Sequence, residues 1–379
     1  MEKRKTVLIL TAPYGNGHIQ VAEQIRKEFL RQGNYEVLEY DLYSEEFPMT
    51  SKWTQKIYLR TYKPGLTQQL YRFAFYGSDK IFNTKIAKPY MKYGLTQLVS
   101  KINEVKPDII INTYPVACAY FLDEKGINLP LYTVITDYYA NGNWISDKTR
   151  LHFLSSANVS YYLKRRDISE DHYKVTGIPV RNEFYKEIKL APLYEKYNLD
   201  PNKKTLLIVS GAHGVMPKTD KVVKHFIEED HIQVVVICGK NKKLYKRLMK
   251  QCKGYENLHT FGYVNEIHEL MRISDLMITK PGGITMTEAA NLGVPVVLFM
   301  PTYGQELENA IYFSQKHAAT IALQEDELVF KVLSILNDES LLEEMKRNIK
   351  DIGIKDSTSN IVHHILDDYK VYLNERNEN

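Results

Sequence analysis

The sequence predicts an α/β protein of two doubly wound domains that face a cleft, and three observations lead to this class. The chain has 379 residues, enough for two domains at roughly 150 residues each. Short apolar runs rich in β-branched residues alternate with helical stretches through both halves, which is typical of βαβ units around a parallel sheet. Gly177 and Pro179 interrupt this alternation near the middle, where such residues favour a domain boundary.

The first half begins with an apolar run that predicts a buried strand. Runs of the same kind predict the strands Val7–Leu10, Tyr35–Tyr40, Ile109–Asn112 and Leu131–Thr136. The stretch Ile19–Leu30 has its apolar residues at helical spacing. Apolar and aromatic residues also recur throughout the basic segment 50–106, so this segment is expected to form helices and not a linker.

The second half repeats the pattern. Its expected strands are Leu206–Ser210, Val234–Cys238, Leu258–Phe261, Leu276–Thr279 and Val296–Phe299. The helical stretches between them include Asp220–Glu229, Lys242–Gln251 and Thr285–Leu292. The expected domains are therefore residues 1–178 and 179–355. An amphipathic helix within 356–379 is expected to pack back on the N-terminal domain.

Composition excludes several classes of protein. Hydrophobic residues make up 44% of the chain and charged residues 25%, the ordinary globular range, so extensive disorder is excluded. Cys118, Cys238 and Cys252 form no disulfide framework or zinc motif, which indicates a reducing cytoplasm. The N-terminal apolar run Thr6–Thr11 is too short for a signal peptide, and no stretch approaches the roughly 20 apolar residues of a spanning helix.

The sharpest motif is T-K-P-G-G-I-T-M-T-E at residues 279–288, which joins a strand to a helix. Gly282 and Gly283 permit a tight turn and a close approach of the backbone to a ligand. A helix expected to start at about Thr285 offers free N–H groups to a phosphate. Glu288, in the expected first turn, can bind a ribose diol. The alternative is a bare strand-to-helix turn in which Glu288 caps the helix.

A second polar cluster follows the next expected strand. Gln305, Glu306 and Asn309 lie at a helix start beyond Val296–Phe299. Because α/β folds bind ligands at the carboxyl ends of neighbouring strands, this cluster is expected beside the Gly282–Gly283 loop. Amide and carboxylate groups are those that hydrogen-bond sugar hydroxyls.

The motifs T-K-P-G-G-x-T-x-T-E and P-x-x-G-Q-E-x-x-N together resemble the nucleotide-sugar domain of glycosyltransferase family 28. Stretches that resemble the glycerolipid branch of that family are Leu10–His18, Lys106–Pro115, Val134–Tyr138, Thr176–Arg181 and Gly211–Gly214. The resemblance runs nearly the whole length and implies the two-domain fold called GT-B. It also implies inverting, processive transfer of glucose from UDP-glucose to diacylglycerol and then, in β-1,6 linkage, to glucosyl-diacylglycerol. The products would be membrane glycolipid and the lipoteichoic acid anchor.

Other proteins of this fold stay open as alternatives. They are a galactosyl-diacylglycerol synthase, the peptidoglycan N-acetylglucosaminyltransferase, a UDP-sugar epimerase and a UDP-sugar-sensing membrane scaffold without turnover. The peptidoglycan enzyme typically has a G-G-T-G-G-H loop where this chain has Gly15-Asn16-Gly17-His18. An epimerase has no need of the basic aromatic segment.

The loop Gly15-Asn16-Gly17-His18 follows the first strand and opens a helix. Gly15 and Gly17 permit close backbone approach, and Gln20 replaces the third glycine of a dinucleotide-binding loop, so a nicotinamide site is disfavoured. A helix start keeps the His18 imidazole neutral. A neutral imidazole suits a base that takes the proton of the acceptor hydroxyl, and the resemblance assigns the same role to His18.

Asp137 ends an apolar strand and is the second candidate for catalysis. It is expected to orient His18 or the acceptor hydroxyl, or to be the base itself. Just beyond it the chain has Asn141-Gly142-Asn143-Trp144, where close relatives often show a His-Lys-x-Trp-like stretch. Only Trp144 matches that stretch, so the sequence does not predict which residues here contact the acceptor.

The leaving UDP is expected to be stabilised without a metal. Arg181 follows the interdomain Gly-Ile-Pro, where a guanidinium can meet the diphosphate. Ser210, Gly211 and His213 end the first strand of the second domain and offer backbone N–H groups to the same phosphates. The resemblance places Val264 beside the uracil. Because no Asp-x-Asp motif appears, neither a metal nor any other cofactor is expected besides the UDP-sugar.

The net charge of +4 hides an asymmetry. Between Lys52 and Lys106, eleven Lys and Arg accompany two acids, a local charge of +9, so the remainder of the chain is net acidic by five. Nucleic acid is not expected as a partner, because no DNA- or RNA-binding module is present. A solvated basic face is the plain alternative.

Aromatic residues interleave with these cations, so a patch that binds an anionic membrane surface is favoured. Its expected members are Lys52, Trp53, Arg60, Arg72, Phe75, Lys80, Lys85 and Lys88. A lipid acceptor stays in the bilayer, so the protein is expected to be peripheral, at the cytoplasmic face of the cell membrane.

Overall fold

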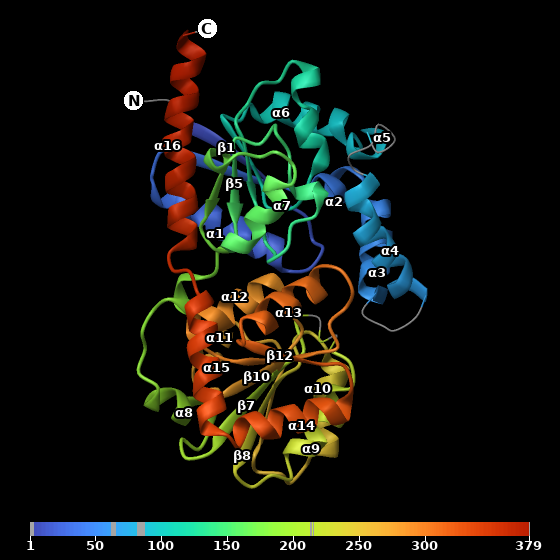
Figure 1. Ribbon diagram of the computed structural model, residues 1–379, viewed down its shortest axis with the longest axis vertical. Coiled ribbons are helices and arrows are strands. Elements are labelled where there is room, and N and C mark those ends of the chain that lie inside the picture. Colours follow the sequence, from blue (N-terminus) through green and yellow to red (C-terminus); the bar gives the residue numbers. More distant parts are fainter. Residues whose placement is uncertain (1–3, 62–65, 82–87, 213, 215, 379) are drawn as a thin grey trace. The chain divides into compact units, whose positions relative to one another are not determined.

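The computed structural model describes residues 4–61, 66–81, 88–212, 214 and 216–378. The chain forms two compact units, one of Met1–Val180 with Ile354–Asn379 (unit 1) and one of Arg181–Gly353 (unit 2). Each unit contains a six-stranded parallel sheet flanked by helices (Figure 1). The chain therefore passes from one unit to the other twice. Its first and last segments both belong to unit 1.

The sheet of unit 1 has the strand order β2-β1-β3-β4-β5-β6. Its strands are β1 (Lys5–Leu10), β2 (Tyr35–Tyr40), β3 (Ile109–Asn112), β4 (Leu131–Val134), β5 (Leu151–Leu154) and β6 (Tyr173–Val175). Leu10 of β1 pairs with both Tyr40 and Asn112. The order of strands thus reverses between β1 and β3, and such a switch point is where open α/β sheets bind ligands.

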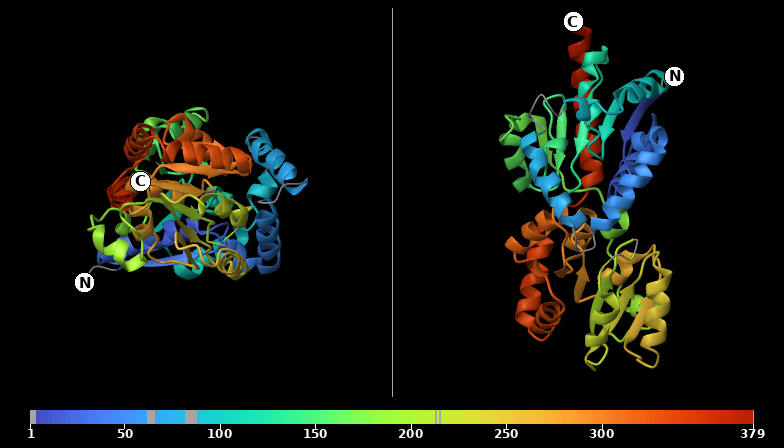
Figure 2. Two further views of the ribbon diagram at one scale, coloured as in Figure 1. Left: turned by 90° about the horizontal axis from the view of Figure 1, so that it is seen from below. Right: turned by 90° about the vertical axis from the view of Figure 1, so that its right-hand side faces the viewer.

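Helices complete unit 1. They are α1 (Gly17–Arg31), α2 (Leu42–Glu46), α3 (Pro48–Thr61), α4 (Leu66–Ile81), α5 (Lys88–Met91), α6 (Leu95–Val105), α7 (Ser160–Lys164) and α16 (Ser357–Glu378). Short 3₁₀ turns are η2 (Ala117–Phe121), η3 (Asp123–Lys125), η4 (Gly142–Trp144), η5 (Ala157–Val159) and η6 (Glu170–His172). Figures 1 and 2 show α3 and α4 (light blue) at the margin of the unit.

The long helix α16 packs against α1 and is tied to unit 1 by polar contacts (Figure 1). Asp368 Oδ2 lies 2.7 Å from Arg150 Nε and accepts a 2.7 Å hydrogen bond from the Tyr132 hydroxyl. The Tyr372 hydroxyl donates to the carbonyl of Asn128 at 2.7 Å. Where the chain leaves the unit, Gly177 has a φ of +78°, and a Cβ there would lie 2.6 Å from Ser357 Oγ. Only glycine fits this close approach.

The sheet of unit 2 has the order β12-β11-β10-β7-β8-β9, which reverses between β7 and β10. Its strands are β7 (Lys204–Val209), β8 (Ile232–Ile237), β9 (Leu258–Phe261), β10 (Leu276–Thr279), β11 (Val296–Phe299) and β12 (Ala319–Ala322). Its helices are η7 (Asn182–Phe184), α8 (Ala191–Tyr197), α9 (Thr219–Phe226), α10 (Lys242–Gln251), α11 (Ile267–Arg272), α12 (Gly283–Leu292), α13 (Gln305–Gln315), α14 (Glu325–Leu336) and α15 (Glu339–Ile352).

Two expectations about elements need correction. Helix α12 begins at Gly283 and not at Thr285, which places Glu288 in its second turn. β5, β6 and β12 were not predicted as strands. Within the part of the chain that the structure describes, no helix is both long and apolar enough to cross a membrane.

Candidate active site

His18 lies at the switch point of unit 1, where three loops meet. It is the second residue of α1, and its Nδ1 lies 2.9 Å from the carbonyl oxygen of Thr113 and 3.0 Å from Thr136 Oγ1. Thr113 follows β3 and Thr136 follows β4. The imidazole is therefore held by groups from the carboxyl ends of β3 and β4, beside the loop that leaves β1.

These contacts define the tautomer and charge of His18. A carbonyl oxygen only accepts hydrogen bonds, so Nδ1 carries the hydrogen and Nε2 keeps its lone pair. Burial lowers the pKa of His18 to about 4, and the bond to the Thr113 carbonyl opposes that shift only in part. The neutrality expected from the helix start is thus caused mainly by desolvation. The ring is equipped to accept a proton at Nε2.

Aromatic rings surround this histidine. The Tyr114 ring meets His18 edge-on at 5.1 Å between centroids, and the Trp144 ring lies 6.0 Å away. Tyr14, from the loop after β1, stacks on Tyr114 at 5.3 Å, and its hydroxyl lies 2.6 Å from Thr54 Oγ1 on α3. Trp144, the residue that agrees with the expected family pattern, therefore contributes one side of the environment of His18.

Asp137 lies three residues beyond β4 and is 7% exposed. Its backbone carbonyl accepts a 2.7 Å hydrogen bond from the Ser155 hydroxyl. The groups recorded on His18 Nδ1 are Thr113 and Thr136, which orient the ring, and the role of Asp137 stays a prediction. Both threonines lie in stretches that carry the family resemblance, but the sequence predicts no role for either, because they belong to two different loops.

The expected phosphate loops of unit 2 lie at its own switch point. Thr279, at the end of β10, donates from Oγ1 to the carbonyl of Val209, the last residue of β7, at 3.1 Å. Gly211 follows β7 with a φ of +79°. A Cβ on Gly239 would lie 2.4 Å from the Gly211 carbonyl oxygen, so the loops after β7 and β8 pack backbone to backbone. His213, expected in the same loop, lies outside the described residues.

The start of α12 supplies N–H groups to this region. Gly282 is its N-cap and makes no side-chain capping bond, so the first N–H groups of the helix are available to an anion. Ser210, by contrast, is fully buried, with Oγ 3.3 Å from Thr219 Oγ1. Its N–H donates to the carbonyl of Ile237 at 3.1 Å, so the expectation that this N–H is offered to a phosphate is wrong, and Ser210 stabilises the loop.

Glu288 and Arg181 interact within unit 2. Glu288 is 6% exposed, and burial raises its pKa to about 7, while the positive charge of Arg181 acts to lower that pKa. One Arg181 nitrogen donates to the Asn265 carbonyl at 2.7 Å, and the guanidinium lies 5.3 Å from the centre of the Phe184 ring. Glu288 consequently changes charge near neutral pH, a property expected at a functional site.

Two buried contacts join the start of α13 to the loop after β10. Glu306 Oε2 lies 3.0 Å from Lys280 Nζ and accepts hydrogen bonds from Thr302, from N at 2.9 Å and from Oγ1 at 2.6 Å. Asn309 Nδ2 donates to the carbonyl of Pro281 at 3.0 Å. The expected proximity of these two segments is confirmed. The ion pair with Lys280 was not predicted.

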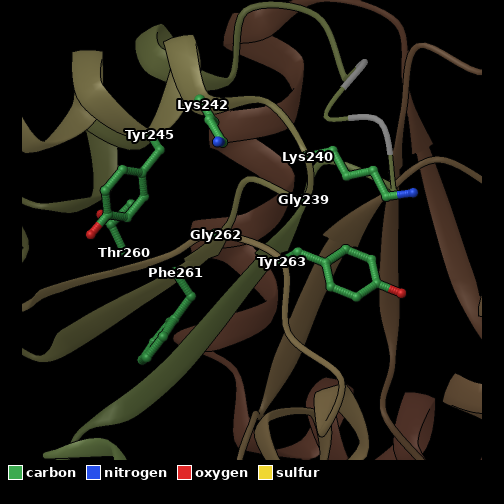
Figure 3. A pocket seen from close by; sticks show the side chains of 8 residues that line it. All are labelled: Gly239, Lys240, Lys242, Tyr245, Thr260, Phe261, Gly262 and Tyr263. Atoms are coloured by element: carbon green, nitrogen blue, oxygen red, sulfur yellow. The ribbon is translucent and has the colours of Figure 1, made fainter.

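A pocket of about 400 Å³ opens between the loops that follow β8 and β9 (Figure 3). In Figure 3, Lys242 and Tyr245 lie on one side of it, and Lys240 and Tyr263 lie on the other. The ammonium of Lys240 lies 5.8 Å from the centre of the Tyr263 ring. Val264 comes directly after Tyr263 and is half-buried.

The expected membrane residues of unit 1 divide into exposed and buried side chains. Trp53 is 65% exposed, and Lys52, Arg60, Arg72 and Lys88 are exposed too. Phe75 is a correction, because it is 8% exposed and its ring lies 5.6 Å from that of Tyr139. Lys80 lies in α4, and Lys85 lies outside the described residues.

The exposed aromatic residue of α4 is Phe73, at 73%. We call the exposed side chains of α3 and α4, among them Lys52, Trp53, Arg60, Arg72 and Phe73, the α3–α4 surface.

Comparison with known proteins agrees with this architecture. The monogalactosyldiacylglycerol (MGDG) synthase model matches residues 18–180, and the glycosyltransferase family 28 C-terminal domain matches residues 205–361. The crystal structure of Acinetobacter baumannii MurG is 17% identical, with a TM-score of 0.66 over 96% of this chain and 99% of that one. The S. aureus MnaA–UDP structure is 17% identical, with a TM-score of 0.63 over 98% and 97%. These likenesses show the fold, which is GT-B.

The fold and the family models together define a glycosyltransferase with a family 28 C-terminal domain. The processive diacylglycerol beta-glucosyltransferase of Bacillus subtilis (strain 168) is 40% identical over 97% of this chain and 96% of its own length. That of Bacillus mycoides (strain KBAB4) is 40% identical over 97% and 94%. The chain belongs to the family of the processive diacylglycerol beta-glucosyltransferases.

Proposed function

We propose that this protein transfers glucose with inversion from UDP-glucose to diacylglycerol, and then to the glucosyl-diacylglycerol formed, in β-1,6 linkage. The names of the relatives that match it over nearly the full length support diacylglycerol as the acceptor and processive β-glucosyl transfer as the reaction. The observation that carries the chemistry is His18, a buried neutral imidazole whose Nδ1 is held and whose Nε2 can take a proton.

In the proposed reaction, unit 1 binds the acceptor and His18 acts as its base. The acceptor hydroxyl oxygen attacks C1 of glucose, its proton passes to His18 Nε2, and the bond from C1 to the diphosphate oxygen breaks. The electron pair of that bond leaves with UDP. Attack from the face opposite the leaving group gives the β-linked product. Asp137 is kept as a residue that contacts the acceptor hydroxyl.

Unit 2 binds the donor in this proposal. Arg181 and the N–H groups at the starts of the loops after β7 and β10 neutralise the charge that develops on the leaving diphosphate. Their residues are Arg181, Gly211, Gly282, Gly283 and Thr285. Glu288 binds the ribose, and Gln305, Glu306 and Asn309 bind the hexose. Val264 and Tyr263 flank the base beside the pocket of Figure 3.

The direct test is incubation with diacylglycerol vesicles and either UDP-glucose or UDP-galactose, followed by lipid chromatography. We expect mono- and diglucosyl-diacylglycerol from UDP-glucose, with the two-sugar lipid appearing after the one-sugar lipid. Absence of any glycolipid would overturn the proposal. A galactolipid as the main product would replace glucose by galactose as the donor sugar.

We propose in addition that the α3–α4 surface binds the anionic cytoplasmic face of the cell membrane. Its exposed cations can contact lipid headgroups, and Trp53 and Phe73 can insert at the interface. Diacylglycerol remains in the bilayer, so the enzyme must reach it there. The Tyr14 hydroxyl, which contacts Thr54 on α3, connects this surface to the loop that carries His18.

Substitution of one exposed ring tests this surface. Phe73→Ser is expected to weaken binding to vesicles of anionic phospholipid roughly tenfold, because a buried phenyl ring contributes about 1.5–3 kcal/mol. Phe330→Ser is the matched control, since Phe330 on α14 is 72% exposed, against 73% for Phe73. Sedimentation with vesicles measures both. Equal losses in the two variants, or none in Phe73→Ser, would contradict the assignment of the surface.

A further inference from the structure

A lysine and a glutamate form a buried ion pair at the proposed sugar site. Lys280 is 9% exposed and Glu306 is 7% exposed, and their charged atoms lie 3.0 Å apart. Lys280 comes directly after β10, whereas Glu306 is the second residue of α13. The pair thus joins the two segments that carry the donor motifs.

A buried pair of this kind is not explained by stability. Removing two charges from water costs as much as their attraction returns, and apolar side chains of similar size serve stability as well or better. Burial lowers the pKa of Lys280, and Glu306 counteracts that shift. We therefore look for the function of the pair in the contacts that the Glu306 carboxylate can make.

The contacts on Glu306 are concentrated on one of its two oxygens. Oε2 receives the ammonium of Lys280, the N–H of Thr302 and the hydroxyl of Thr302. Oε1 takes part in none of these three contacts. These contacts fix the orientation of the carboxylate. Because the carboxylate is planar and rigid, holding Oε2 also fixes the position of Oε1.

We propose that Lys280 is a positioning residue of the donor site, which keeps Glu306 ionised and oriented so that Oε1 accepts a hydrogen bond from a hydroxyl of the transferred hexose. This inference rests on the proposed function, in which Glu306 binds that hexose. An ionised acceptor bonds a hydroxyl more strongly than a neutral one does. Lys280 would thereby set the affinity for the sugar without touching it.

The charged residues around Glu306 indicate that Lys280 is its cationic partner. Among the described residues, Lys280 is the charged group recorded in contact with its carboxylate. The next acid on α13 is Glu308, and the acid on α12 is Glu288, which interacts with Arg181. β12 carries no charged residue. Loss of Lys280 would leave the Glu306 carboxyl buried without a cation, and such a carboxyl ionises only at higher pH.

The test compares donor kinetics and UDP binding in four variants. Lys280→Met is expected to lower kcat/KM for UDP-glucose at least tenfold near neutral pH, with recovery as pH rises, because Glu306 then needs a higher pH to ionise. Lys280→Arg should restore the pH profile of the wild type. The double variant Lys280→Met with Glu306→Gln should be slow, with no pH dependence beyond that of the wild type. UDP alone, measured by calorimetry, should bind all of them equally well.

Lys346→Met is the matched control. Lys346 belongs to the same unit and pairs with Glu343 at 2.9 Å and Asp275 at 3.5 Å. Its loss should leave the pH profile the same as that of the wild type. A wild-type profile in Lys280→Met would overturn the inference, and so would loss of UDP binding, which would indicate a role in the fold of the nucleotide site. Failure of the proposed function is distinguishable, because the wild type itself would then form no glycolipid.

Discussion

Replacement of His18 by alanine is expected to lower kcat by about 10²–10⁴-fold, the usual contribution of a general base. The reason is local, since Thr113 and Thr136 hold Nδ1 and no other group on this loop can take the proton at the position of Nε2. The affinity for UDP should not change, because UDP is proposed to bind unit 2. Initial rates of glucolipid formation, with calorimetry of UDP binding, measure both quantities.

The chain offers a matched control for this substitution. His152 on β5 is also fully buried, and burial lowers its pKa to about 4 as well. Its ring contacts Ser146 and the carbonyl of His172, within the sheet of unit 1. His152→Gln should reduce stability while keeping kcat per folded molecule. If His18→Ala retains kcat within threefold of the wild type, Asp137 replaces it as the candidate base.

The charge state of His18 also predicts a pH profile. Its folded pKa of about 4 lies below the ordinary value of 6.5, so the imidazole is neutral at every pH above about 5. Protonation of His18 should therefore cause no loss of activity between about pH 5 and 8. Any acid limb in that range must come from another group.

Glu288 is the second residue for which we expect a large effect. Glu288→Gln should weaken UDP binding by about 10–100-fold, since hydrogen bonds to a charged group contribute roughly 1.5–3 kcal/mol. The wild-type carboxyl has a pKa raised to about 7, so it is protonated below that pH and ionised above it. Because the ribose hydroxyls favour the ionised form, UDP affinity should rise as pH increases through about 7.

The same linkage predicts proton release on binding. Near pH 7 a fraction of Glu288 is protonated in the free protein, and bound UDP displaces that proton. Calorimetry in two buffers of different ionisation enthalpy measures the proton count directly. Glu288→Gln should abolish the release, and Glu343→Gln on the surface of α15 should not. Proton uptake in the wild type would show that Glu288 does not bind the ribose as a carboxylate.

The strands Tyr35–Tyr40, Ile109–Asn112, Leu258–Phe261, Leu276–Thr279 and Val296–Phe299 agree with the structure to the residue. A continuous apolar run is not what separates them from the missed strands, because Leu258–Phe261 contains His259 and Thr260, and the missed β5 contains His152 among three apolar residues. Of the other missed strands, β6 is three residues long at the sheet edge, and β12 contains two alanines and a threonine. Their assignment depends on neighbours in the sheet and not on their own residues.

The site shows a similar division. Motif residues such as His18, Glu288 and Glu306 are recognisable because glycines and strand ends surround them in the sequence. Lys280 lies within the T-K-P-G-G motif, but the sequence predicts no role for it, because a lone lysine before a proline is ordinarily a surface residue. Its partner lies in another motif, and only the packing of α13 against the loop after β10 brings the two charges together.

The double crossing of the chain has a consequence for biosynthesis. Unit 1 contributes its strands early, yet α16, which buries Ile361, Ile365 and Tyr369 in that unit, is translated only after all of unit 2. On the ribosome, unit 2 can finish folding while the sheet of unit 1 still lacks a covering helix. The apolar surface that α16 covers therefore stays exposed until unit 2 has been translated, and the last helix to be synthesised completes the first unit to begin.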